Sequence, residues 1–353
     1  MTFRNMRILV VGGAGFVGSN LVHALLAHAP REVLIVDNFL SSDHANLPSG
    51  HGVRLLEGSI TDPAILAAIP DDLDVVFHLA CFHGNQSSIA DPLADHENNT
   101  LTSLMLFERL KAMKSLRKVV YAAAACAVAE KTFGAPEATT EDQPVSLYHD
   151  SPYSISKIIG ELYGNYYFQR FGLPFVKARF SNVYGPREIL GAGRWRGTSH
   201  TVWRNVTPTF VWRALRSESL PLENGGQASR DFVFVGDMAR GLQACALRGR
   251  PGEVYNLASG RETTILELAQ RINNATGNRA PLDLRPARDW DHSGRRFAST
   301  EKAERELGFR TTVGIEEGIA ATVEWTREHV TLIERCIAQH DGEMARAARF
   351  ATA

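Results

Sequence analysis

The sequence lacks the features that mark several large classes of protein. Its 38 basic and 39 acidic residues nearly cancel, and the formal net charge over 353 residues is -1. No excess of positive charge therefore attracts it to nucleic acid or to an anionic membrane surface. No continuously apolar run approaches the roughly 20 residues that cross a bilayer, and the first residues carry neither a signal-peptide core nor an Arg- and Ser-rich transit pattern. These absences predict a cytoplasmic protein that binds neither nucleic acid nor membrane.

Cysteine is scarce as well. The four cysteines, Cys81, Cys126, Cys245 and Cys336, are scattered, with no CxxC pair and no His/Cys cluster at metal-ligand spacing. Cysteines used in this way are typical of reduced, mostly buried thiols. We therefore expect no disulfide and no metal site.

What the sequence does contain is a regular alternation of short apolar runs with helical segments. The runs are RILVVG (7–12), VLIVD (33–37), VRLLEG (53–58), DVVFHLA (74–80), KVVYAA (118–123) and FVKARFSN (175–182). This alternation predicts a parallel sheet. Because each run is continuously apolar, both faces of the sheet should be covered by helices, which gives the doubly wound α/β arrangement of a Rossmann-type fold.

A glycine-rich turn follows the first run. In GGAGFVG, the residues Gly12, Gly15 and Gly18 are three apart, and the helical segment SNLVHALLAH follows at once. Glycines let the backbone approach a pyrophosphate, and the free N–H groups at the helix N-terminus face the anion. Asp37 ends the next strand, where a carboxylate would bind the adenosine ribose hydroxyls and repel a 2′-phosphate. The turn therefore predicts NAD as the cofactor, in preference to NADP.

The alternation of runs breaks near Gly185, and this break divides the chain. We expect an NAD-binding Rossmann domain over 1–182, to which 233–262 return, and a smaller C-terminal substrate-binding lobe formed by 183–232 and 263–330. Residues 331–353 should form a helical tail. Within these parts, the apolar spacing predicts helices over 265–276, 300–307 and 315–329. The smaller lobe should lie at the carboxyl edge of the sheet, where α/β folds bind their ligands.

A tyrosine and a lysine four residues apart begin another predicted helix. In DSPYSISKIIGELY, Asp150 or Ser151 can cap the helix, and Tyr153 and Lys157 share one face. A phenol, with an ordinary pKa of about 10, serves as a base near neutral pH only when nearby cations lower that pKa. Lys157 and an oxidised nicotinamide would supply such cations. Tyr153 is therefore the predicted acid/base and Lys157 its partner.

In combination, these motifs resemble the extended short-chain dehydrogenase/reductase family, specifically its nucleotide-sugar epimerase and dehydratase branch. The resemblance spans residues 7–327 and includes VDN, VFHLA, SIADP, PYSISK, RFSNVYGP, SRDFVFVGDMA, YNLASG and STEKAERELGF. It implies a tightly held NAD, and a homodimer formed through the helix at 97–115 and the helix of Tyr153. The cofactor contacts carried over are Gly12, Gly15, Phe16, Val17, Gly18, Asp37, Asn38, Ser59, Ile60, Leu79, Ala80, Asn99, Tyr153 and Lys157.

The resemblance also implies a nucleoside diphosphate-sugar as substrate, surrounded by Asn182, Arg230 and Arg288. A diphosphate calls for charge-assisted and preferably bidentate donors, which agrees with the two arginines. A second hypothesis concerns the long loop 187–205, which is expected to form a lid over the sugar. Its cations, with Arg295 and Arg296, suggest that the sugar carries a carboxylate, as a uronate does.

Two departures from the family pattern affect the predicted chemistry. Where the family has a Ser or Thr that hydrogen-bonds the reacting sugar hydroxyl, this chain has Ala124 or Ala125, and only Cys126 nearby is polarisable. Either Ser87, Ser88 or a water replaces that hydroxyl, or the chain is a slow catalyst. The second departure is Ser59, which stands where the family usually has an Asp against the adenine.

The same alanine-rich stretch distinguishes between reactions. Dehydratases and decarboxylases of the family place acidic residues directly after the catalytic Ser or Thr, and here those positions hold Ala and Cys. The resemblance therefore implies a UDP-sugar 4-epimerase acting through a transient 4-keto sugar. Two alternatives stay open. One is an NAD(P)H-dependent nucleotide-sugar ketoreductase or dehydrogenase, and the other is a dinucleotide-binding protein without catalytic activity.

Overall fold

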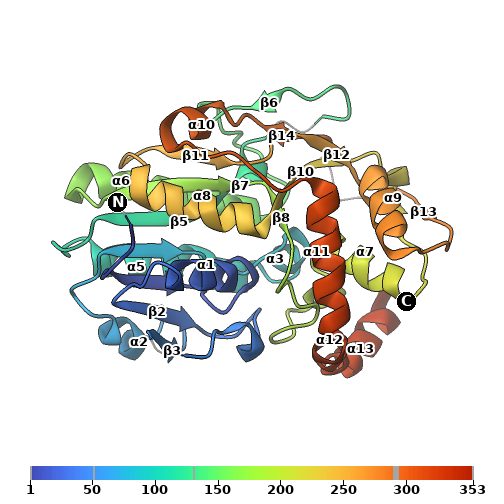
Figure 1. Ribbon diagram of the computed structural model, residues 1–353, viewed down its shortest axis with the longest axis horizontal. Coiled ribbons are helices and arrows are strands. Elements are labelled where there is room, and N and C mark those ends of the chain that lie inside the picture. Colours follow the sequence, from blue (N-terminus) through green and yellow to red (C-terminus); the bar gives the residue numbers. More distant parts are fainter. Residues whose placement is uncertain (1, 51, 130–131, 289–293, 352–353) are drawn as a thin grey trace.

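The structure, a computed structural model, describes residues 2–50, 52–129, 132–288 and 294–351. Its centre is a seven-stranded sheet of order β11-β7-β5-β4-β1-β2-β3 (Figure 1). Every neighbouring pair in this sheet is parallel. The strands are β1 (Arg7–Val11), β2 (Glu32–Asp37), β3 (Val53–Glu57), β4 (Val75–His78), β5 (Lys118–Ala124), β7 (Phe175–Phe180) and β11 (Val254–Leu257). The first six coincide with the six predicted apolar runs.

Helices cover both faces of the sheet, because each strand sends alternate side chains to opposite sides. From β1, Ile8 and Val10 pack into one core, and Leu9 and Val11 pack into the other. The first core is closed by α1 (Phe16–Leu26), α8 (Val235–Arg248) and α10 (Glu301–Leu307), and the second by α2 (Pro63–Ala68), α5 (Thr102–Leu110) and α6 (Pro152–Phe171). The predicted doubly wound α/β fold is confirmed.

Helix α6 is held close to the sheet. It begins where the Oγ atom of Ser151 accepts a hydrogen bond of 3.3 Å from the backbone N–H of Ser154. A Cβ atom at Gly160 or Gly164 would collide with the rings of Tyr121 or Phe175. The two glycines therefore let α6 lie directly on β5 and β7, with its first turn at the carboxyl edge of the sheet.

The rest of the chain forms a smaller body beside that edge, with α11 (Ile315–Glu328) standing along it (Figure 1). Helices α7 (Val206–Leu215) and α9 (Ile265–Thr276) pack with α11 around a third core. The strands of this smaller body form three small sheets. One contains β8 (Asn182–Tyr184), β10 (Ser229–Phe234) and β12 (Glu262–Thr264). In the other two, β9 (Pro221–Glu223) pairs with β13 (Asp283–Arg285), and β6 (Ala138–Thr139) pairs with β14 (Phe297–Ala298).

The remaining helices are α3 (Asn85–Ala90) and α4 (Pro92–Asp95), which follow β4, and α12 (Val330–Ala338) and α13 (Asp341–Ala351), which form the tail. The predicted helix over 265–276 has the bounds of α9, and the other two predictions match α10 and α11 within a residue. Over the described ranges, no helix has the length and apolar character needed to span a membrane. Within the same ranges, no three His, Cys, Asp or Glu side chains are grouped so that they could hold a metal ion.

Candidate active site

A continuous cavity of about 700 Å³ lies between the carboxyl ends of the sheet strands and the smaller body. Its volume is within the range of small-molecule sites. The glycine turn and Asp37, from the sheet side, line it together with Tyr153 and Lys157 of α6 and with Arg230 and Arg288 of the smaller body. The residues predicted from three separate motifs therefore face one space.

The glycine turn forms a cradle that has no room for side chains. Gly12 has a φ of +85°, and a Cβ atom there would collide with the backbone of Ala80. A Cβ atom at Gly18 would collide with the carbonyl oxygen of Gly12. Helix α1 starts after Gly15 with no side-chain cap, so its first N–H groups remain available to an anion. These features fit the pyrophosphate of a dinucleotide such as NAD.

Asp37 lies at the end of β2, buried beside this turn. Its Oδ2 atom accepts a hydrogen bond of 2.9 Å from the backbone N–H of Ala14, and its Oδ1 atom accepts bonds of 2.9 Å from the backbone of Phe39 and the hydroxyl of Ser42. Burial raises the pKa of Asp37, against the effect of these hydrogen bonds. The backbone N–H of Gly15 also interacts with this carboxylate, which lines the cavity where the ribose of a bound dinucleotide would lie.

Tyr153 and Lys157 occupy the first two turns of α6 and both line the cavity. The Nζ atom of Lys157 donates a hydrogen bond of 2.9 Å to the carbonyl oxygen of Ala122 on β5. The same Nζ atom lies 5.8 Å from the centre of the Tyr153 ring. Lys157 is only 4% exposed, so its charge is held close to the phenol rather than in bulk water.

Two predicted ligand contacts do not line the cavity. The hydroxyl of Ser88 donates to the carbonyl oxygen of Asn85 (2.7 Å) and accepts from the backbone N–H of Tyr153 (3.1 Å). The amide of Asn99 bonds to the backbone N–H of Phe82 (2.7 Å) and to the carboxylate of Asp95 (2.7 Å). In this structure the two side chains therefore support the cavity wall and the start of α6 through hydrogen bonds to the protein, and their contact with a ligand stays a prediction. The other predicted contacts line the cavity.

The diphosphate end contains Asn182, Arg230 and Arg288 as predicted. Nη1 of Arg230 donates to the carbonyl oxygen of Gly294 (2.8 Å), and Nη2 of Arg288 lies 3.3 Å from Oε1 of Glu223. Arg296 also lines the cavity, but Arg295 does not, and its guanidinium makes two bonds of 2.7 and 2.9 Å to the carboxylate of Glu262. The uronate hypothesis therefore loses Arg295 as a cation available to the sugar.

The loop 187–205 forms a wall of the cavity. Its Arg204 donates to the carbonyl oxygen of Ser41 (2.6 Å), and the backbone N–H of Arg194 donates to Leu40 (3.1 Å), so the loop is bound to the segment after β2. From the tail, Gln339 and His340 bond to the carbonyl oxygen of Gly191 at 2.7 and 2.8 Å. The loop is thus held from two sides.

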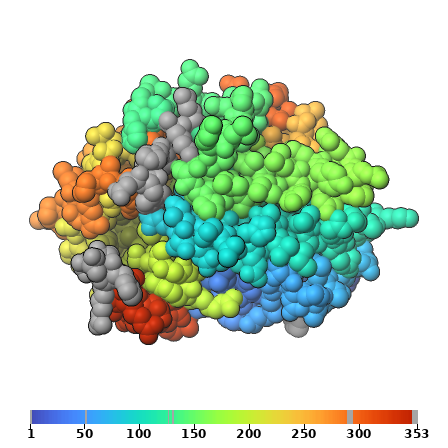
Figure 2. All heavy atoms as spheres, turned by 180° about the vertical axis from the view of Figure 1, so that it is seen from behind, coloured from blue at the N-terminus to red at the C-terminus, as the bar shows by residue number. Residues whose placement is uncertain are grey.

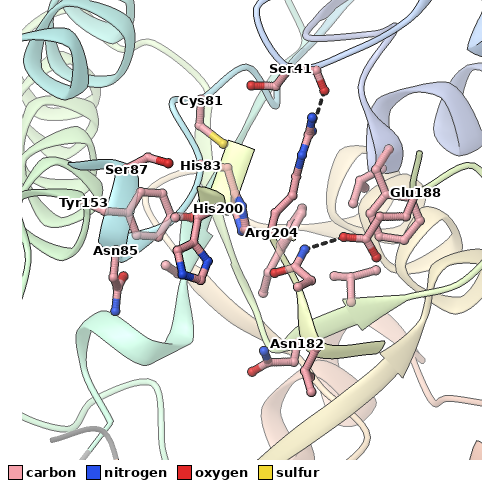
Figure 3. A pocket seen from close by; sticks show the side chains of 18 of the residues that line it. Ser41, Cys81, His83, Asn85, Ser87, Tyr153, Asn182, Glu188, His200 and Arg204 are labelled. Atoms are coloured by element: carbon pink, nitrogen blue, oxygen red, sulfur yellow. Dashed lines mark hydrogen bonds between the residues drawn. The ribbon is translucent and has the colours of Figure 1, made fainter. Parts of the chain in front are cut away.

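Several lining residues were not predicted (Figure 3): Cys81, His83, Asn85, Glu188 and His200. Two cations of the loop 187–205, Arg187 and Arg204, also line the cavity. The ring of His83 packs edge-on against Tyr153, with centroids 5.7 Å apart. Burial and the charges of Arg196, Arg204 and Lys157 lower the pKa of His83 to about 3. Burial also raises the pKa of Glu188 to about 7. The signal available for Cys81, His83 and Asn85 was their position directly after a buried parallel strand, where α/β sheets form sites.

Comparison with known proteins identifies the family of this chain. A model of the NAD dependent epimerase/dehydratase family matches residues 8–258. The chain belongs to this family. The predicted family branch is therefore confirmed.

Relatives and solved structures of this family resemble nearly the whole chain. The UDP-glucose 4-epimerase of Mycolicibacterium smegmatis is 31% identical, over 91% of this chain and 99% of that protein. A dTDP-glucose 4,6-dehydratase of Streptomyces antibioticus is 30% identical, over 92% of this chain and 93% of that protein. The crystal structure of the Bordetella bronchiseptica enzyme WbmF in complex with NAD+ and UDP is 56% identical, covers 98% of this chain and 99% of that one, and has a TM-score of 0.88.

Proposed function

We propose that this protein is an NAD-dependent epimerase of nucleoside diphosphate-sugars, which inverts C4 of a UDP-sugar through a transient 4-keto intermediate. One observation carries the proposal: Tyr153 and Lys157 lie in a single cavity between a glycine cradle that fits a pyrophosphate and a cluster of Asn and Arg side chains that fits a diphosphate. The similarity to UDP-sugar 4-epimerases and to a structure with bound NAD+ and UDP supports it.

NAD, which the glycine cradle and Asp37 would hold, would supply the acceptance and return of a hydride. The chain does the rest. The glycine cradle and Asp37 hold the cofactor, and Tyr153 takes the proton of the C4 hydroxyl and later returns it. Lys157 stabilises the phenolate through its charge. Arg230, Arg288 and the N-terminus of α7, whose N-cap residue Asn205 makes no side-chain cap, hold the diphosphate.

The positions directly after the missing hydroxyl support an epimerase over a dehydratase. They hold Ala and Cys, where the family's dehydratases have acidic residues, and Ala124 and Ala125 are buried in the cavity wall. Elimination of water would need a further acid or base at this place. An epimerase needs none there, because its cycle is redox-neutral and the same tyrosine serves both half-reactions.

A homodimer is part of the proposal. Helix α6 exposes Ile155 (45%), Leu162 (61%) and Tyr166 (53%), and it packs beside α5 on the same face. Figure 2 shows these two helices, green and cyan, side by side on that face. An apolar surface of this kind is typical of a protein interface. The proposed compartment is the cytoplasm, where nucleotide-sugars are made and consumed.

The test is to incubate the purified protein with UDP-, GDP-, CDP- and dTDP-sugars without added reductant, following the sugar by NMR and the absorbance at 340 nm. We expect a new isomer of unchanged mass and no lasting NADH signal. Lasting NADH formation, or conversion only with added NAD(P)H, would instead identify a dehydrogenase or ketoreductase. No conversion with any sugar would contradict the proposal.

A further inference from the structure

The cavity wall near Tyr153 lacks a hydroxyl at the place where the family has one. Ala124 and Ala125 line this wall, 6% and 7% exposed, and carry only methyl groups. A reacting sugar oxygen needs a second hydrogen-bonding partner besides the phenol, since the charge that develops on it must be stabilised in a space without bulk water. In the described cavity, the segment that follows β4 offers such a partner.

His83 is the side chain best placed for this role. It follows β4, lines the cavity, and packs its ring edge-on against Tyr153 with an interplanar angle of 73° (Figure 3). Over the described ranges, neither ring nitrogen of His83 makes a hydrogen bond to the protein. Its polar atoms are therefore available to a ligand that occupies the cavity beside the phenol.

The backbone around His83 is fixed on both sides. Nη1 of the buried Arg196 donates a hydrogen bond of 3.0 Å to the carbonyl oxygen of His83, and its guanidinium lies 5.6 Å from the centre of the Phe82 ring. The carbonyl oxygen of the Asn99 side chain accepts a bond of 2.7 Å from the backbone N–H of Phe82. The backbone that carries the imidazole is thus fixed before any ligand binds, and the ring itself packs against Tyr153. Such preorganisation is what a group that stabilises a transition state requires.

The surroundings keep this imidazole neutral. Burial and three cations, Arg196, Arg204 and Lys157, lower the pKa of His83 to about 3. A neutral imidazole has one N–H donor and one acceptor nitrogen. It therefore has the hydrogen-bonding capacity of the Ser or Thr hydroxyl that is missing, and it does not compete with Tyr153 for the proton.

We propose that His83 replaces the missing hydroxyl and hydrogen-bonds the reacting oxygen of the sugar beside Tyr153. This inference rests on the proposed epimerase function. In the forward half-reaction, the Tyr153 phenolate takes the hydroxyl proton, the C4–H bond breaks with its electron pair transferred to NAD, and a carbonyl forms at C4. The N–H of His83 donates to that oxygen throughout and keeps its proton. The return half-reaction reverses each step on the other face of the sugar.

Ser87 is the competing candidate. It is 1% exposed, lines the cavity, and its Oγ atom has no hydrogen-bond partner in the described structure. Unlike His83, however, it has no ring contact that brings it against the phenol. The experiment therefore includes Ser87→Ala, to learn which of the two side chains stands in for the hydroxyl.

The test compares His83→Phe, which keeps the ring against Tyr153 and removes both nitrogens, with His83→Gln, which keeps a donor. On the sugar that the wild-type protein converts, we expect His83→Phe to lower kcat on the order of 10²-fold and His83→Gln to recover part of that loss. His28→Phe, a change at a histidine outside the cavity, should leave kcat unchanged. Ala124→Ser and Ala125→Ser are each added to His83→Phe, and the one of the two that stands at the family's Ser or Thr position should restore activity, because it returns the hydroxyl.

Calorimetry gives a readout that does not depend on turnover. His83→Phe should bind UDP as tightly as the wild-type protein does and bind the UDP-sugar more weakly. If His83→Phe keeps full kcat, or if Ser87→Ala alone causes the loss, the role of His83 is refuted while the epimerase function stands. If the wild-type protein converts no sugar, it is the proposed function that fails.

Discussion

The carboxylate of Asp37 accepts a hydrogen bond of 2.9 Å from the backbone N–H of Ala14, which joins the end of β2 to the glycine turn that follows β1. One side chain therefore fixes the shape of the cradle and also lines the place where an adenosine ribose would lie. The sequence predicted only the second role. Substitution of Asp37 should therefore affect both the shape of the glycine turn and the binding of the cofactor.

Asp37→Asn should weaken NAD binding and relax the discrimination against NADP. The amide removes the charge that repels a 2′-phosphate and loses one or two charge-assisted hydrogen bonds, each worth about 1.5–3 kcal/mol. We expect NAD affinity to fall at least about tenfold, with a smaller loss for NADP. Titration of the cofactor-stripped protein with each dinucleotide measures this, and an unchanged affinity ratio would rule out contact with the ribose.

Tyr153→Phe should abolish epimerisation without disturbing nucleotide binding. Removal of a positioned acid/base typically costs 10²–10⁴-fold in rate, whereas the diphosphate contacts lie at another part of the cavity. The measurement is kcat together with the Kd for UDP. Tyr148→Phe is the matched control, because Tyr148 is 88% exposed and does not line the cavity. Equal effects of the two changes would remove Tyr153 from the mechanism.

The pH dependence of stability should report on Glu188. Burial raises its pKa from the ordinary 4.5 to about 7, although the hydrogen bond from Asn205 and the charge of Arg204 act in the opposite direction. Between these two values the folded protein holds a proton that the unfolded chain has released, so stability falls as pH rises through this window, by at most about 3 kcal/mol.

Glu188→Gln removes this titration. The variant should therefore gain stability relative to the wild-type protein on going from pH 5 to pH 8, measured as the difference between their Tm values. The exposed Glu328→Gln serves as control. A difference in Tm that does not change with pH would contradict the raised pKa.

The ion pair between Glu161 on α6 and Arg179 on β7 should support the position of the Tyr153 helix. Two bonds of 2.9 and 2.8 Å join the side chains, which are only 8% and 5% exposed. Glu161→Ala leaves a buried guanidinium without its partner, so we expect a loss of about 3–5 kcal/mol. Urea unfolding measures it. Glu343→Ala, in the exposed pair with Arg346, should cost less than about 1 kcal/mol.

Features encoded over short stretches of sequence could be predicted. The sheet strands are continuous apolar runs, and the Gly12 turn and the Tyr153–Lys157 pair depend on spacings of a few residues, so each was located correctly. The direction in which a polar side chain points depends instead on tertiary packing. Ser88 and Asn99 hydrogen-bond to the backbone of Tyr153 and Phe82, and no spacing in the sequence indicates these bonds.

Contacts between segments that are distant in the sequence could not be predicted either. Glu262 on β12 forms an ion pair with Arg295, 33 positions further along the chain, and His83 packs against Tyr153 although 70 positions separate them. Neither relationship leaves a local pattern, because each depends on how the smaller body and the loops close on the edge of the sheet. Placement after a parallel strand narrows the candidates, but it does not say which of them meet.

The most direct test of the account is epimerisation of the accepted UDP-sugar in D₂O, with the C4 hydrogen of the product followed by NMR. Because the hydride leaves C4 and returns to it within one active site, the product should have inverted configuration at C4 and retain protium there. Deuterium at C4 of the product would mean that the carbon exchanges a proton with solvent, and it would contradict a mechanism built on Tyr153 and hydride transfer to NAD.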